Sequence, residues 1–75
     1  MEFITLNGKT LKAENFQGAA IALWQMMLVP EPTLEEWMAG SAKRALEWDG
    51  SIIRTSSPQE HIQDLITAGL LVQVK

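Results

Sequence analysis

Hydrophobic and polar positions divide the chain into short segments with the periodicity of helices or strands. The longest apolar run is Ala19–Val29, in which only Gln25 is polar. Its residues favour a helix, the run is too short to span a bilayer, and a helix that is apolar on nearly every side has to be surrounded by the rest of the chain. We therefore expect a central core helix, capped by Asn15 and ending before Pro30.

A β-hairpin is predicted at the start of the chain, where Asn7-Gly8 separates Glu2–Leu6 from Lys9–Ala13. Asn-Gly favours the two positive φ angles of a two-residue type I′ turn. The expected cross-strand pairs are Leu6 with Lys9, Thr5 with Thr10, Ile4 with Leu11, and Phe3 with Lys12. In this register Ile4, Leu6, Leu11 and Ala13 face the core. Phe3 lies on the outer face, either as a contact for Lys12 or as an exposed anchor for a partner.

A second helix is predicted from the capping box Thr33–Glu36 to the C-terminal glycine Gly50. Its apolar residues fall at helical spacing: Leu34, Trp37, Met38, Ala42, Ala45 and Trp48. Trp37 and Trp48 are separated by about three turns and point the same way. Gly40-Ser41 interrupts the pattern, and one continuous helix is favoured over a helix-turn-helix at this position.

The C-terminal third contains a strand, a helix and a second strand. Ser51–Thr55 is rich in β-branched residues and predicts a strand. A capping box at Ser57–Glu60 starts a helix that buries Ile62, Leu65 and Ile66 and stops at Gly69, and Leu70–Val74 then forms a strand. The expected order is ββααβαβ. This is a single α+β domain over residues 1–75, with an N-terminal hairpin and a short antiparallel sheet packed on three helices.

The run Ser57–Val72 resembles the end of a winged-helix domain, in which a capped recognition helix ends in Ala-Gly-Leu and enters a strand. The resemblance implies a winged-helix-like DNA-binding transcriptional regulator as an alternative function. Recognition helices of that family usually carry Arg or Lys, but Pro58–Ala68 has no basic residue. Binding of nucleic acid would then depend on a patch of Lys43, Arg44 and Arg54. This patch forms if the second helix lies beside the strand at 51–55.

Composition and charge disfavour several classes of function. The formal net charge of −3 disfavours non-specific binding to nucleic acid or anionic membranes. Without cysteine there is neither a disulfide nor a Cys/His metal cluster. We find no signal peptide and no transmembrane segment, and we expect a cytoplasmic protein without cofactor or metal.

Candidate catalytic residues are sparse. The one histidine, His61, lies three residues before Asp64, but a general base also needs a nucleophile and an oxyanion site. We expect a surface histidine. Glu35 and Glu36 are adjacent, so they project in different directions and do not form an acid/base pair. The chain is therefore not predicted to be an enzyme.

Protein binding is the leading prediction. Three tryptophans and four methionines are many for so small a chain, and interfaces are enriched in both residue types. The candidate partner-binding residues are Trp37, Met38, Trp48 and Phe3. The partner is another protein or a second copy in a homodimer, and the role is that of an accessory adaptor or inhibitor, a type that phages and mobile elements often encode.

Overall fold

Strands from both ends of the chain form one antiparallel sheet in the computed structural model, which describes residues 1–75. Strand β1 (Glu2–Thr5) lies between β2 (Thr10–Lys12) and β3 (Leu71–Gln73). The helices are α1 (Phe16–Gln25), α2 (Leu34–Asp49) and α3 (Pro58–Thr67). The molecule is therefore a small α+β protein, as predicted.

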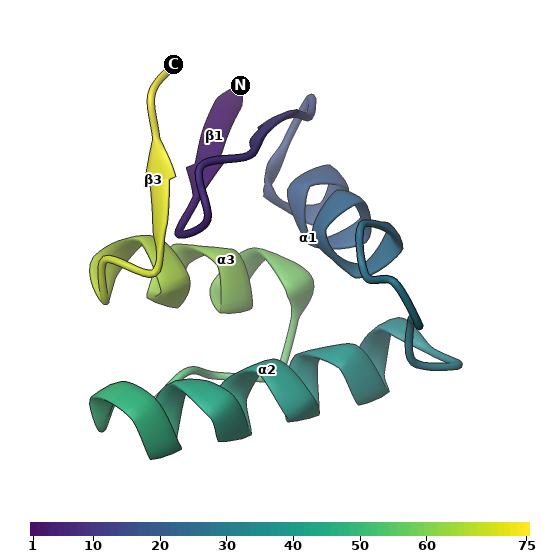
Figure 1. Ribbon diagram of the computed structural model, residues 1–75, viewed down its shortest axis with the longest axis vertical. Coiled ribbons are helices and arrows are strands. Elements are labelled where there is room, and N and C mark those ends of the chain that lie inside the picture. The colour runs from purple at the N-terminus through teal and green to yellow at the C-terminus, as the bar shows by residue number, and fades with distance from the viewer.

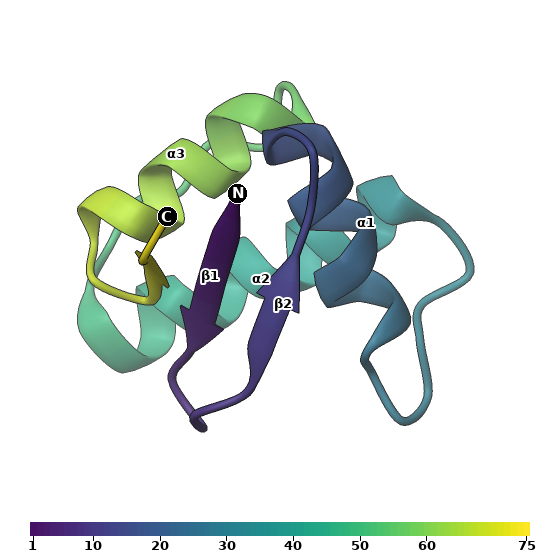
Figure 2. The same ribbon diagram turned by 90° about the horizontal axis from the view of Figure 1, so that it is seen from above.

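The helices are layered on the sheet, with α3 between the strands and α2 (Figure 1). Seen from above, α1 lies on the β2 side of the sheet (Figure 2). The rings of Phe3 and Phe16 meet edge to face, 6.1 Å between centroids, and join β1 to α1. The buried apolar residues are Phe3, Leu11, Ala19, Ala20, Trp37, Met38, Ala45, Ile53, Ile62, Leu65 and Leu71.

The hairpin has a different register from the predicted one. Phe3 pairs with Leu11, and the Thr5 N–H donates to the Lys9 carbonyl at 2.9 Å, so the loop contains three residues. Within the hairpin loop only Gly8 has a positive φ, +83°, whereas a type I′ turn needs two residues with positive φ. A shift of one residue exchanges the two faces of a strand. Phe3 is therefore completely buried and Ile4 is exposed, so the predicted outward position of Phe3 is wrong.

Helix α1 is capped by Asn15, whose side chain accepts from the Gly18 N–H at 2.8 Å, but it ends at Gln25. Only Ala19 and Ala20 are buried along it, and Leu28 beyond its end is 99% exposed. The prediction of a helix surrounded on nearly every side is therefore wrong. The chain turns back early because the Trp24 indole N–H donates to the Glu31 carbonyl at 2.8 Å, which closes the loop.

The predicted caps of α2 and α3 are confirmed. The Thr33 hydroxyl accepts from the Glu36 N–H, and Gly50 ends α2 at a φ of +69°. Ser57 caps α3 in the same way, accepting from the Glu60 N–H at 3.2 Å. Helix α2 runs through Gly40-Ser41 without a break, so the continuous helix is confirmed and the helix-turn-helix alternative is wrong.

The predicted strand at Ser51–Thr55 is absent, and the observed order is ββαααβ. The backbone of Arg54 is paired with side chains of α3 instead of a neighbouring strand. Its N–H donates to Asp64 Oδ2, and its carbonyl accepts from His61 Nδ1, both at 2.9 Å. Ile53 is nevertheless buried, so the segment contributes to the core without joining the sheet.

The register of the hairpin can be tested by comparing two substitutions. Phe3→Ala should lower the free energy of unfolding by about 3–5 kcal/mol, since it removes a fully buried aromatic ring. Ile4→Ala should cost about 1 kcal/mol or less, because Ile4 lies on the exposed face. Urea unfolding followed by circular dichroism measures both. A larger loss for Ile4→Ala than for Phe3→Ala would contradict the observed register.

Candidate functional site: a groove beside α2

An open groove of about 480 Å³ lies between α2, the end of α1 and the hairpin loop. Ten of its fifteen lining residues are hydrophobic, so its wall is mainly apolar. We call it the α2 groove. The residues that α2 contributes are Trp37, Ser41, Arg44, Ala45 and Trp48.

The floor of the α2 groove follows from helical periodicity. Positions 37, 41, 44, 45 and 48 repeat at intervals of three and four, which places them on one side of a helix. Trp37 at one end is 4% exposed and contacts the core, whereas Trp48 at the other end is 79% exposed. Ser41 and Ala45 lie between them. The floor is thus a stripe of small residues with an indole at each end.

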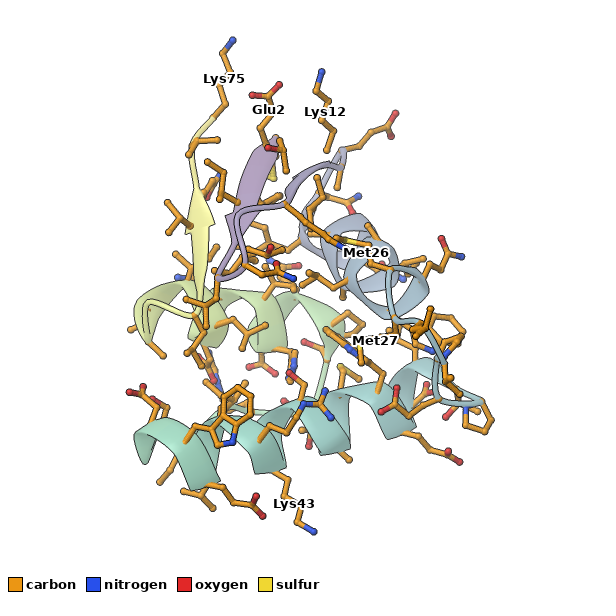
Figure 3. The ribbon with its side chains drawn as sticks, in the orientation of Figure 1. Glu2, Lys12, Met26, Met27, Lys43 and Lys75 are labelled. Carbon is orange, nitrogen blue, oxygen red and sulfur yellow. The ribbon has the colours of Figure 1, made fainter.

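The walls come from segments that are distant in sequence. The turn that follows α1 contributes Met26 and Met27, of which Met27 lies between α1 and α2 in Figure 3. The hairpin contributes Leu6 and Lys9, and α3 and β3 contribute Leu65 and Leu71. Methionine is flexible and polarizable, which allows it to adapt to differently shaped surfaces.

The predicted partner-binding residues have different positions in the structure. Trp48 is exposed at the mouth of the groove, while Trp37 lines its inner end and is almost buried. Met38 is 3% exposed and Phe3 is fully buried, so neither presents a surface to a partner. Trp37 and Trp48 do point to the same side of α2, as their spacing predicted, but only Trp48 lies beyond the edge of the core.

The three basic residues predicted to form a nucleic-acid patch serve different local roles. Arg44 lines the α2 groove, with its Nη1 4.0 Å from Glu31 Oε1. Lys43 projects from the opposite side of α2, away from the other elements (Figure 3). Arg54 forms ion pairs with Glu60 and Asp64, each at 2.9 Å. The charge of Arg54 is therefore largely compensated within the chain.

The Arg54–Asp64 pair is bidentate, since Nε and Nη2 donate to the two carboxylate oxygens at 2.9 Å. These hydrogen bonds from the guanidinium, with that from the Arg54 backbone, lower the pKa of Asp64 to about 2. Hydrogen bonding to Asp64 raises the pKa of Arg54 in turn. The Ser56 hydroxyl donates to Glu60 and lowers its pKa, and Arg54 acts in the same direction.

His61 is fully buried, so the prediction of a surface histidine is wrong. Its Nδ1 donates to the Arg54 carbonyl, and its ring meets Trp37 edge to face with centroids 5.2 Å apart. Its Nε2 is buried without a hydrogen-bond partner. Burial disfavours the charged imidazolium and lowers the pKa of His61. The ring joins α3 to α2 and to the preceding segment.

The structure brings no three potential metal ligands among His, Cys, Asp and Glu together. None of the three helices combines the length and apolar character needed to cross a bilayer. Comparisons with protein-family models, with curated proteins and with solved structures gave no match. The interpretation of the α2 groove therefore depends on its own residues.

Burial of His61 should make the protein less stable as the pH falls below the ordinary histidine pKa of 6.5. The pKa of His61 is lower in the folded state than in the unfolded state, so the unfolded state takes up its proton at a higher pH and protonation favours unfolding. Unfolding in urea at pH 7.5 and pH 5.0 measures the loss. The side-chain amide in His61→Asn can still donate to the Arg54 carbonyl but cannot titrate. In this variant the free energy of unfolding should differ less between pH 7.5 and pH 5.0 than it does in the parent protein. An unchanged difference would contradict this assignment.

Asp64 should cause a second loss of stability at lower pH. Its pKa rises from about 2 in the folded state to its ordinary 3.8 on unfolding, so its stabilising effect is present above 3.8 and is lost as the pH falls toward 2. Asp64→Asn removes the ion pair with Arg54 and should flatten the stability curve between pH 4 and pH 2. The steepness of acid unfolding followed by circular dichroism is the measurement. A slope equal to that of the parent protein would contradict this role.

Proposed function

We propose that the protein is a non-enzymatic, cytoplasmic protein-binding module, an adaptor or inhibitor that receives its partner in the α2 groove. The observation that carries the proposal is the position of Trp48, 79% exposed at the mouth of a mainly apolar groove. Tryptophan is enriched among the residues that dominate binding energy at interfaces. An indole in this position supplies a large contact area when a partner covers it.

The surrounding surface supports a protein partner. Met26 and Met27 form part of the groove and are themselves exposed, and methionine is enriched at interfaces. Scattered exposed apolar residues are ordinary in soluble proteins, so the support comes from their concentration in one concave region. Further exposed apolar side chains are Leu6, which also lines the groove, and Leu28, Val29, Leu46 and Ile52.

The contacts of the polar residues favour a binding function over catalysis. His61 is sealed inside the molecule and donates to a backbone carbonyl, so it does not face a substrate. Ser57 caps α3, and Ser56 donates to Glu60. These contacts account for the three residues as parts of the fold.

The contacts also favour protein over nucleic acid as the partner. Helix α3, the counterpart of a recognition helix in the winged-helix resemblance, lies between the strands and α2 (Figure 1). Two of its carboxylates, Glu60 and Asp64, form ion pairs with Arg54 and compensate the charge of that residue. A winged-helix-like regulator stays the alternative, and nuclease treatment in the experiment below distinguishes it from the proposed module.

Trp48→Ala should abolish partner capture without unfolding the protein, since the side chain removed is exposed. We expect a loss of affinity of more than about tenfold, as for an interface residue that dominates binding. The measurement is an affinity pull-down from host lysate, with and without nuclease, read by mass spectrometry and followed by titration of the captured protein.

Lys43→Ala is the matched control, because Lys43 lies on the opposite side of the same helix (Figure 3). A nuclease-resistant partner retained by Lys43→Ala and lost by Trp48→Ala would support the module. Capture that is insensitive to Trp48→Ala, or that disappears on nuclease treatment, would overturn it.

A further inference from the structure

We infer that the occupant of the α2 groove is an amphipathic helix of the partner protein, with an apolar stripe toward the groove and carboxylates beside it. This inference rests on the proposed function and specifies the chemistry of the partner. Helices commonly bind in such grooves through apolar side chains at intervals of three and four residues.

The sign of the charge in the groove is opposite to that of the whole protein. The charged lining residues are Lys9 and Arg44, with no Asp or Glu, although the chain has a net charge of −3. Lys9 forms no ion pair within the chain. Arg44 has a single partner, Glu31, at the long separation of 4.0 Å, and 43% of its side chain is exposed. Lys9 is thus free to meet a carboxylate of a ligand, and Arg44 is held by one long ion pair that leaves its exposed part accessible to a second carboxylate.

The geometry of the floor suits a helix of about three turns. Trp37 and Trp48 are eleven residues apart on α2, about 16 Å at the rise of an α-helix. Between them Ser41, which is small and partly exposed, allows a second helix to approach α2, whereas Ala45 is 5% exposed and belongs to the core. A partner helix of this length presents three or four apolar side chains on one side.

Two of the three helices of a second copy have no free apolar side to offer. The apolar sides of α1 and α3 are packed in its own core through Ala19, Ala20, Ile62 and Leu65. The remaining helix, α2, provides the floor of the groove itself. An α2 helix from a second copy, paired about a two-fold axis, is the competing occupant, and a concentration-dependent dimer of the free chain that covers Trp48 would overturn the inference.

The test uses defined peptides and does not require the natural partner. The probe is a capped 15-residue peptide without tryptophan, with leucines at positions i, i+3, i+4 and i+7 and glutamates at most other positions. Its two controls replace the glutamates by lysines, or place two prolines in the middle to prevent a helix. Binding is followed by isothermal titration calorimetry and by the emission of the three tryptophans of the protein at low salt, which should shift to the blue as Trp48, the most exposed of them, is covered.

We expect the glutamate peptide to bind at least about fivefold more tightly than the lysine peptide, and the proline peptide to lose binding. Arg44→Glu should lower the affinity for the glutamate peptide by about fivefold and raise the affinity for the lysine peptide. Lys43→Glu makes the same change of charge on the opposite side of α2 and should leave both affinities almost unchanged.

Equal binding of the two charged peptides, or undiminished binding of the proline peptide, would overturn the acidic-helix inference. So would failure of the glutamate peptide to bind the intact protein. The proposed function is judged separately: a natural partner whose capture depends on Trp48 would preserve it even if every peptide failed. If the peptides fail to bind and no partner is captured through Trp48, the inference and the proposed function are both overturned.

Discussion

Arg54 is held by α3 through its backbone and its side chain. Asp64 accepts from the backbone N–H and from the guanidinium, and His61 donates to the carbonyl. These bonds satisfy the polar groups of a segment that has no strand to pair with, and they fix the path from α2 into α3. The ring of His61 contacts Trp37, so the same residue also positions α2. The donor of the bond from His61 is fully buried, and a buried donor left unpaired is costly, which couples the three elements.

The open groove follows from this way of positioning α2. The helix contacts the core through Trp37, Met38 and Ala45, and its last turn continues past the core, leaving Trp48 exposed. A 75-residue chain has too little apolar volume to cover both sides of a four-turn helix. The stripe of α2 residues was predictable from its spacing. The methionine wall and Lys9 were not, because segments distant in sequence meet there only after folding.

The sequence predicted best those features that depend on residues within one helical turn. The caps of α2 and α3 and the glycine ends of these helices are of this kind. Asn7-Gly8 indicated a hairpin correctly, but it is compatible with loops of two or three residues, and that difference decides whether Phe3 faces inward. The β-branched segment at 51–55 looked like a strand, and its real partners, the side chains of α3, have no signature in its own sequence. For the same reason the burial of His61 was missed.

The first and last residues of the chain leave the sheet side by side. The Glu2 N–H donates to the Lys75 carbonyl at 3.0 Å, and the Val74 N–H donates to the Glu2 carbonyl at 2.9 Å. In Figure 1 both ends lie at the side of the molecule opposite α2. Polypeptide attached to both ends would therefore depart as a closely spaced pair. The whole unit can be carried within a surface loop of a larger protein, with the side that bears α2 directed away from its host.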